Sequence, residues 1–291
     1  MTQFNLNMLA SFQSLSQELV DEIVSYLQED KNSLLACSLT CRSLVPGCQK
    51  ALFPNLCVGA FPAQSGRAIV TSIPTIQHFL KLMEMMPHVA AYTKTLKLTF
   101  EFDFLEEGLD EHLVAQLALF RCLTHFSLHF MESSTFYLLM SSELKSSIQN
   151  ILSLRTLEYL RLIDVPADIL PYDTSIKHLV VHFCDFESRA QSAHRDVRRF
   201  LEGSQPTGLP RLDGKSSTAI ESLDFDHSER SITLGVNYVL NSPALNLFKL
   251  KRLQIDIEDM ETVDQHKHIS RLLQACSSIQ VLRFISSRDS E

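Results

Sequence analysis

A phrase of two apolar residues separated by a single residue recurs along the chain, and it constrains the fold more than any other feature. Its seven copies read KTLKL, LTHFSL, LEYLRL, IKHLVV, IESLDF, LKRLQI and IQVLRF. Four of the six gaps between successive copies are 29 to 34 residues long, and the first apolar residues are Leu96, Phe126, Leu160, Leu179, Leu223, Leu253 and Leu282. Residues two apart point to the same side of a β-strand, so each copy predicts a strand with one buried face.

Segments with the apolar spacing of a helix lie between most copies of the phrase. They read TIQHFLKLMEMM, LDEHLVAQLALF, FYLLMSSELKSSIQNIL, DVRRFLEG and HKHISRLLQAC. A strand, a helix and another strand in about 30 residues build a parallel sheet from stacked repeats. We therefore predict an α/β fold, with a flexible insertion at about 202–217, where glycine, proline and serine are frequent.

The recurring phrase resembles the leucine-rich repeat of irregular type. One unit fits the full repeat pattern, through Ile176, Leu179, Val181, Cys184 and Phe186, whereas the other units carry different residues at the Asn/Cys position. The resemblance implies an irregular solenoid with a parallel sheet over residues 59–291.

The stretch SLLACSLTCRSLV, Ser33 to Val45, predicts a helix that is apolar on more than one side. A helix that lies on one core needs a single apolar stripe, so either the chain encloses this helix or another molecule covers it. An amphipathic helix precedes it in SLSQELVDEIVSYLQED, and a short third helix is expected after a break at Pro46 and Gly47. Three helices in about 40 residues bury little surface alone, so the surplus apolar face predicts a partner or a neighbouring domain.

The order Leu-x-x-Glu-Leu-x-x-x-Ile-x-x-Tyr-Leu, followed by a polar turn and Leu-Leu-x-x-Ser-Leu-x-Cys-Arg, resembles the F-box, and PGCQKALFPNLCV resembles its fungal variant. The resemblance covers roughly residues 12–58, within a predicted helical unit of residues 1–58, and implies docking on the Skp-family adaptor of cullin-RING ubiquitin ligases. In the family these apolar positions divide between a small core and the adaptor. The implied adaptor-binding residues are Leu15, Glu18, Leu19, Ile23, Leu27, Leu34, Leu35, Leu39 and Leu44. The alternative is a helical hairpin that merely caps the next domain.

A target-binding surface follows from the strand geometry. If the paired apolar residues of each phrase face the core, the residue between them and the one after them face outward. We call the set of these outward-facing residues the outer ribbon. Ile163, Val180 and Ile285 are expected to be its exposed apolar residues. Apart from Arg283, its charged members form a basic half and an acidic half: Lys97, His129, Arg161 and His182, then Asp224, Asp226 and Asp256. Ordinary solvated positions are the alternative interpretation.

Charge and motifs argue against other classes of protein. A net charge of −8 disfavours nucleic-acid binding, which needs clustered cations. The DGKSS stretch lacks the spacing of a phosphate loop, and His178 and His182 would lie about 13 Å apart along a strand, which is too far for one metal ion. The seven cysteines lie mostly in apolar runs and indicate reduced thiols of an intracellular protein. The start of the sequence lacks signal-peptide features, and no apolar run is long enough for a membrane span. We therefore predict a cytoplasmic or nuclear protein without a membrane segment.

The resulting functional prediction is a non-catalytic receptor. Its F-box would dock on the Skp-family adaptor, and through it on cullin, while the repeat domain binds an unknown protein target. No cofactor, metal, nucleic acid or membrane partner is expected. The alternative is an interaction scaffold, similar to leucine-rich-repeat proteins, that has no link to ubiquitination.

Overall fold

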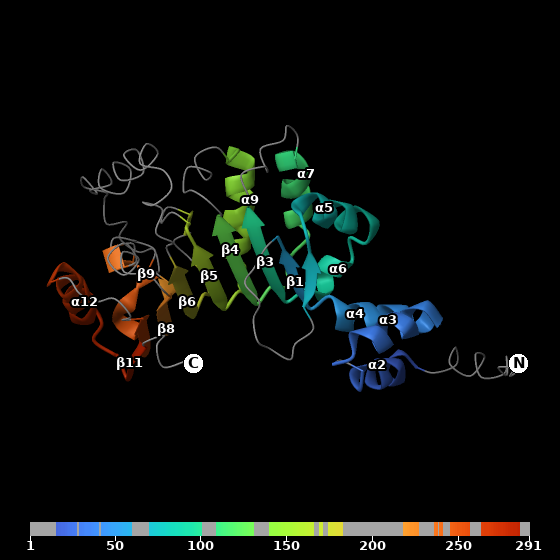
Figure 1. Cartoon of the computed structure of the whole chain (residues 1–291), viewed down its shortest axis with the longest axis horizontal. Coiled ribbons are helices and arrows are strands. Elements are labelled where there is room, and N and C mark those ends of the chain that lie inside the picture. Colours follow the sequence, from blue (N-terminus) through green and yellow to red (C-terminus); the bar gives the residue numbers. More distant parts are fainter. Residues whose placement is uncertain are drawn as a thin grey trace, which may run out of the picture. The chain divides into compact units, whose positions relative to one another are not determined.

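The computed structural model of the chain describes residues 16–27, 29–40, 42–59, 70–100, 109–130, 140–165, 169–170, 174–182, 218–226, 236–237, 239–240, 245–256 and 263–285. These residues form eight α-helices and eleven strands (Figure 1). Two compact units divide between Leu96 and Lys97. The predicted insertion at 202–217 lies outside the described residues.

The first unit begins with a small helical bundle. Its elements are α2 (Gln17–Ser25), α3 (Lys31–Thr40), the 3-10 turn η1 (Arg42–Leu44) and α4 (Val45–Leu52). Both α2 and α3 pack against η1 and α4. The expectation that the second helix runs to Val45 is wrong, because α3 ends at Thr40 and Val45 already begins α4. Pro46 fits the first turn of α4, where a missing N–H breaks no helical bond.

The remainder of the first unit contains β1 (Asn55–Val58), β2 (Thr71–Ile73), α5 (Ile76–Met85) and α6 (Val89–Tyr92). Strands β1 and β2 pair in parallel. A 2.8 Å hydrogen bond joins His88 Nε2, just before α6, to Gln49 Oε1 of α4. The predicted domain boundary after residue 58 therefore falls inside this compact unit.

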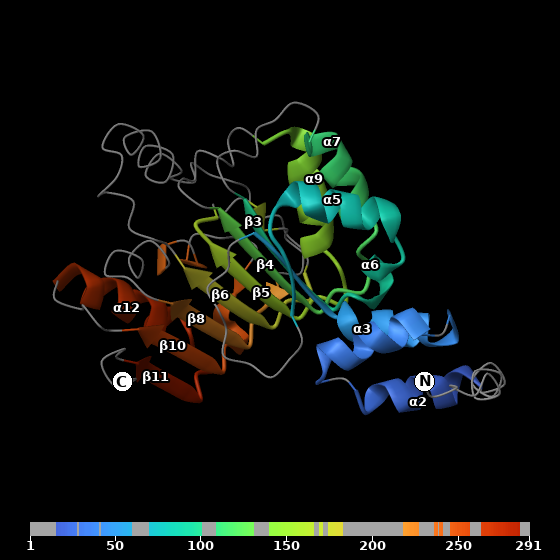
Figure 2. The same cartoon turned by 45° about the vertical axis from the view of Figure 1, so that its right-hand side comes forward.

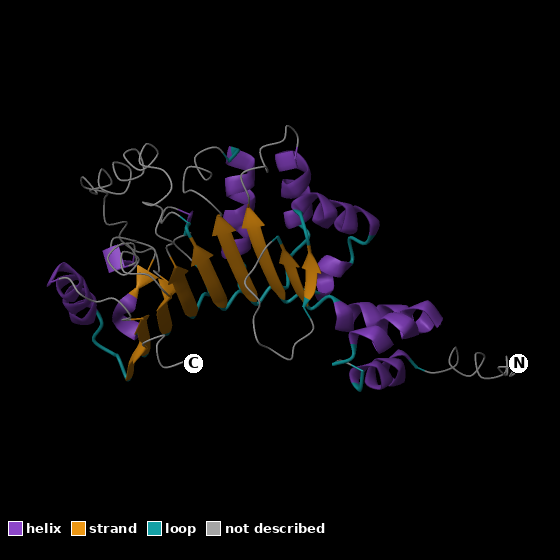
Figure 3. Cartoon of the chain, in the orientation of Figure 1, coloured by secondary structure: helices purple, strands orange, loops and turns teal. Residues whose placement is uncertain are grey.

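A nine-stranded sheet forms the centre of the fold, in the order β11-β10-β8-β6-β5-β4-β3-β1-β2. The seven copies of the phrase correspond to seven of these strands: β3 (Thr95–Phe100), β4 (His125–Phe130), β5 (Tyr159–Ile163), β6 (His178–His182), β8 (Ser222–Asp226), β10 (Arg252–Asp256) and β11 (Val281–Ile285). Figure 3 shows their arrows running in one direction. The predicted α/β class with a parallel sheet is confirmed. A separate pair is formed by β7 (Thr218–Ala219) and β9 (Leu245–Asn246).

The register of the sheet aligns the paired apolar residues of the phrase. From β4 to β11 the first of them are opposite one another, in the order Phe126, Leu160, Leu179, Leu223, Leu253 and Leu282. The second aligned row is Leu128, Leu162, Val181, Phe225, Ile255 and Phe284. All these side chains are buried except Leu282 and Phe284 of the edge strand β11. The two rows therefore form the core side of the sheet.

Strands of the second unit begin with the same pair of backbone hydrogen bonds. The residue just before a strand and the first residue of that strand both donate their N–H groups to one carbonyl, which belongs to the residue just before the preceding strand. Glu158 and Tyr159 donate to Thr124 in this way, and Lys177 and His178 donate to Glu158. The series continues with carbonyls of Lys177, Glu221 and Lys251. From Glu158 onward, the residues just before the strands also alternate in charge. Lys177 Nζ lies 2.6 Å from Glu158 Oε1, and Lys251 Nζ lies 3.0 Å from Glu221 Oε2. This ladder of bonds and charges aligns each strand with the one before it.

Helices α7 (Leu109–Leu117) and α9 (Ser142–Leu152) pack side by side in the second unit (Figure 2), and α12 (Val263–Ala275) connects β10 to β11. Ser141 caps the start of helix α9, because its hydroxyl accepts a hydrogen bond from the N–H of Leu144 at 3.2 Å. The N–H of Ser141 donates to Asp110 Oδ2 of α7 at 3.2 Å, which ties the two helices together. The helices predicted in LDEHLVAQLALF and HKHISRLLQAC are thus present, the one predicted in FYLLMSSELKSSIQNIL begins at Ser142, and DVRRFLEG lies outside the described residues.

Candidate protein-binding surfaces

Helix α2 separates its apolar residues into a buried and an exposed stripe. Val20 and Val24 are 1% and 3% exposed and belong to the core of the bundle. Leu19, Ile23 and Tyr26 are 49%, 40% and 82% exposed. Residues spaced by three or four lie on one face of a helix, so the second stripe is one continuous apolar face.

Helix α3 is divided in the same way. Leu34 is fully buried, whereas Leu35 and Leu39 are 44% and 88% exposed. Together with the exposed stripe of α2 they form what we call the α2–α3 apolar set: Leu19, Ile23, Tyr26, Leu35 and Leu39. Exposed leucines are common one at a time, but five large apolar side chains on two short helices leave much apolar area in water.

The predicted adaptor-binding residues fall into three groups. Leu15 lies outside the described residues. Leu19, Ile23, Leu35 and Leu39 belong to the α2–α3 apolar set, and Glu18 is exposed in the first turn of α2. Leu34 and Leu44 are core residues of the bundle, and the half-buried Leu27 packs against that core. These last three side chains belong to the packing of the bundle and not to its exposed apolar surface.

Two polar groups at helix starts stabilise the bundle. The pKa of Glu18 is lowered by a hydrogen bond from its own backbone N–H and by one from the Ser16 hydroxyl. Asp30 Oδ1 accepts from the N–H groups of Asn32 and Ser33, both at 3.1 Å, and thereby caps α3. The Ser33 hydroxyl donates to Asp30 Oδ2 at 2.5 Å, and these contacts with Ser33 lower the pKa of Asp30. The sequence did not lead us to predict this cap, although aspartate is one of the residues preferred at the position just before a helix.

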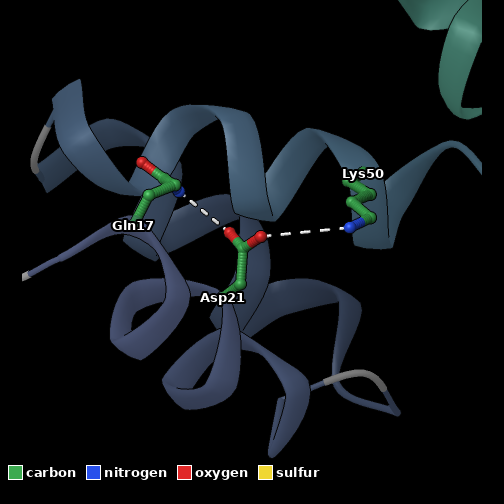
Figure 4. A network of polar contacts seen from close by, with 3 residues as sticks. All are labelled: Gln17, Asp21 and Lys50. Carbon is green, nitrogen blue, oxygen red and sulfur yellow. Dashed lines mark hydrogen bonds and ion pairs between the residues drawn. The ribbon is translucent and has the colours of Figure 1, made fainter.

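Asp21 joins α2 to α4 in a polar network (Figure 4). Gln17 Nε2 donates to Asp21 Oδ1 at 2.8 Å, and Lys50 Nζ lies 3.9 Å from Asp21 Oδ2. Gly47 lies in close packing beside this network. A Cβ atom at that position would lie 3.1 Å from Asp21 Oδ1 and 3.3 Å from Val24 Cγ2. Glycine thus allows α4 to approach α2.

Replacing Gly47 with leucine is expected to destabilise the bundle by about 1–3 kcal/mol, because the added side chain forces α4 away from α2. Chemical denaturation followed by circular dichroism measures the change. Ala36→Leu is the matched control, since Ala36 is exposed on α3 of the same bundle and its replacement should change stability by less than about 0.5 kcal/mol. Equal stability of Gly47→Leu and wild type would contradict the described helix packing.

The outer ribbon is aligned by the register of the sheet. Arg161 is opposite Val180, which is opposite Asp224, and Ile163 lies between His129 and His182. Strands are about 4.8 Å apart, so these rows place three members of the basic half on β4–β6, with Asp224 directly beside them, while Lys97 lies on β3. Gln254 Nε2 donates to Asp224 Oδ2 at 3.0 Å and continues that row.

Much of the outer ribbon is less exposed than predicted. Its charged members Lys97, His129, Arg161, His182 and Asp224 are half-buried. The expected exposure of Ile163 and Val180 is wrong, since they are 4% and 8% exposed, whereas Ile285 is 38% exposed. Parallel sheets are commonly covered on both faces, and the uninterrupted apolar run in β6 is typical of such strands. The side chains of Asp226 and Asp256 lie outside the described part of the structure.

His129 of the outer ribbon has a strongly lowered pKa. Burial lowers its pKa to about 4, and the nearby His182 and Arg161 act in the same direction. Burial likewise lowers the pKa of His125, at the start of the same strand. His129 is consequently neutral at pH 7, and the basic half carries less charge than a count of its residues suggests.

Acidification is expected to destabilise the chain through His129. Between pH 6.5 and about 4 the unfolded chain binds a proton at this histidine and the folded chain does not, so stability falls as the pH falls. Allowing for solvent screening, the loss between pH 7 and pH 5 is about 1 kcal/mol. Urea denaturation at both pH values measures it. His129→Gln should reduce the loss, whereas His112→Gln, at an exposed position of α7, should not. An unchanged loss in His129→Gln would exclude this residue as the cause.

Possible metal ligands and two buried thiols bear on the chemistry of the described residues. The described part of the chain contains no group of three His, Cys, Asp or Glu residues placed to hold a metal ion. Burial raises the pKa of Cys276 to about 11 and also raises that of Cys48, so both thiols are protonated and weakly nucleophilic at neutral pH. None of the described helices combines the length and the hydropathy needed to span a bilayer.

Comparison with known proteins does not assign the chain. No protein-family model matches its sequence, and a search of curated proteins finds no match either.

Proposed function

We propose that the chain is a non-catalytic substrate receptor of a cullin-RING ubiquitin ligase. Its helical bundle docks on a Skp-family adaptor, and through the adaptor on cullin, while the repeat sheet binds a protein target in the cytoplasm or nucleus. The resemblance of residues 1–58 to the F-box motivates the first half of this proposal, and the irregular leucine-rich-repeat pattern motivates the second.

The observation that carries the proposal is the division of the apolar residues on α2 and α3. An F-box needs one group of apolar side chains for its own core and a second group for the adaptor. Val20, Val24 and Leu34 are buried, and the α2–α3 apolar set is exposed. That exposed set includes four of the nine residues that the resemblance assigned to adaptor binding.

The outer ribbon is the proposed target surface. Its half-buried charges, Arg161 and Asp224 among them, lie on rigid strands and in adjacent rows. Charges held in fixed positions favour one partner over others and speed its association. The target is a protein whose surface presents the complementary charges.

Reconstitution from purified components tests the function. The full chain, a Skp-family adaptor and the adaptor-binding domain of a cullin are mixed and analysed by size-exclusion chromatography with light scattering. A stoichiometric ternary complex that requires the adaptor is expected. Failure of the chain to bind the adaptor at micromolar concentrations would remove the ligase function and favour the alternative, an interaction scaffold that acts through its repeat sheet alone.

A further inference from the structure

We propose that the free edge of β11 binds an extended segment of a partner protein, which adds to the sheet as a tenth parallel strand. The segment has apolar residues two positions apart with an acidic residue between them. This inference concerns the second compact unit and does not depend on adaptor binding by the helical bundle.

Strand β11 is exposed along its whole length. Leu282 and Phe284 occupy the core-side rows of the sheet, yet they are 40% and 48% exposed, whereas Leu253 and Ile255 at the same positions of β10 are buried. Val281 and Ile285, on the opposite face, are 37% and 38% exposed. Proteins usually protect an edge strand with proline, lysine, a bulge or a very short length. β2, at the other edge, has three residues, whereas β11 has five residues without proline or lysine, and Arg283 is its one charged residue.

The hydrogen-bond ladder identifies the acceptor that the partner would use. Carbonyls of Thr124, Glu158, Lys177, Glu221 and Lys251 each accept two successive N–H groups from the following strand. Gln280 occupies the next position, since its own N–H and that of Val281 donate to Lys251 at 2.8 and 2.9 Å. Within the described residues, no backbone N–H donates to the Gln280 carbonyl. A parallel strand that donates there continues the register of the sheet.

Charge at the edge selects an acidic partner. Arg283 and Arg252 are both exposed and lie on the same face, as diagonal neighbours across β10 and β11. Neither arginine forms an ion pair with another described residue. In the row of aligned residues that contains Arg283, the nearest described carboxylate is that of Asp224. Gln254 lies between the two residues and donates a hydrogen bond to Asp224. A carboxylate directly opposite Arg283 would form a cross-strand ion pair.

The sequence of β8 supplies a probe of the required chemistry. Residues 220–226, IESLDFD, already pair in parallel with β10, and Leu223, Asp224 and Phe225 provide the apolar, acidic and apolar side chains. A fluorescein-labelled peptide of this sequence is titrated with the full chain and followed by fluorescence anisotropy. In the proposed register the peptide residues that correspond to Leu223, Asp224 and Phe225 lie opposite Leu282, Arg283 and Phe284.

The expected result is saturable binding that responds to both charge and backbone. Arg283→Glu should weaken binding at least about tenfold, and a peptide with lysine in place of its aspartate at position 224 should restore binding to that variant. Methylation of the two peptide amides that donate to Gln280 should abolish binding, because it removes both N–H groups. Arg271→Glu, which alters an exposed arginine on α12, is the matched control and should bind like wild type.

Three results would overturn the proposal. The first is no binding of the peptide to the wild-type chain. The second is binding that persists after amide methylation and in Arg283→Glu, which would place the peptide elsewhere. The third is a dimer of the chain in sedimentation velocity that Phe284→Asp dissociates, since the occupant of the edge would then be a second copy. Adaptor binding is measured on the same variants and should not change.

Discussion

The double substitution Leu19→Asp and Leu39→Asp is expected to abolish binding of the chain to a Skp-family adaptor while the bundle stays folded. Leu19 is about half exposed and Leu39 largely exposed, at 49% and 88%, so their loss removes little packing. In the complex each would bury apolar area that stabilises binding by about 1.5–3 kcal/mol, and an aspartate there would be a desolvated charge. The affinity should fall by more than about 100-fold, as measured by isothermal titration calorimetry.

A matched variant separates this effect from a general loss of apolar surface. Met85 is 65% exposed on α5 of the same unit, outside the α2–α3 apolar set. Met85→Asp should bind the adaptor like wild type. The far-ultraviolet circular dichroism of all variants must match that of wild type. If the folded double variant binds as tightly as wild type, the α2–α3 apolar set is not the adaptor surface.

The second large effect is expected from the core of the sheet. Phe126 is fully buried in β4, in the row that continues through Leu160 and Leu179. Phe126→Ala should destabilise the sheet by about 3–5 kcal/mol, because it loses apolar burial and leaves a cavity that the two neighbouring strands cannot close. Differential scanning calorimetry should show a melting temperature lower by roughly 6–20 °C.

The control for this prediction is the same substitution at an exposed phenylalanine. Phe248 is 68% exposed in the 3-10 turn η4 (Leu247–Lys249), so Phe248→Ala should change stability by less than about 0.5 kcal/mol. Similar melting temperatures for the two variants would show that the phrase does not identify core residues.

Strand positions could be predicted from the sequence because the phrase combines a period of two with a regular spacing. All seven predicted strands are present, from β3 to β11. The short strands β1 and β2 were not predicted, since Asn55–Val58 and Thr71–Ile73 lack the phrase and are only four and three residues long. So short a segment depends on its neighbours in the sheet more than on its own propensity.

Exposure was harder to predict than position. Leu19 and Leu34 are both leucines of predicted helices, and the sequence does not distinguish them. Only the packing of α4 and η1 decides that Leu34 is buried while Leu19 is not. The second face of the sheet poses the same problem. Alternation in β5 suggested a solvated face, yet Ile163 is buried because parallel strands are commonly covered on both sides.

The paired hydrogen bonds at the strand starts have a consequence for engineering the chain. They align successive strands although the anchors Leu160 and Leu179 are 19 residues apart and Leu179 and Leu223 are 44 apart. Strand alignment is thus independent of the length of the connection. Lengthening a connection should cost only loop-closure entropy, roughly 0.6 kcal/mol for each doubling. Foreign peptides, affinity tags or whole domains could therefore be inserted between strands without shifting the sheet.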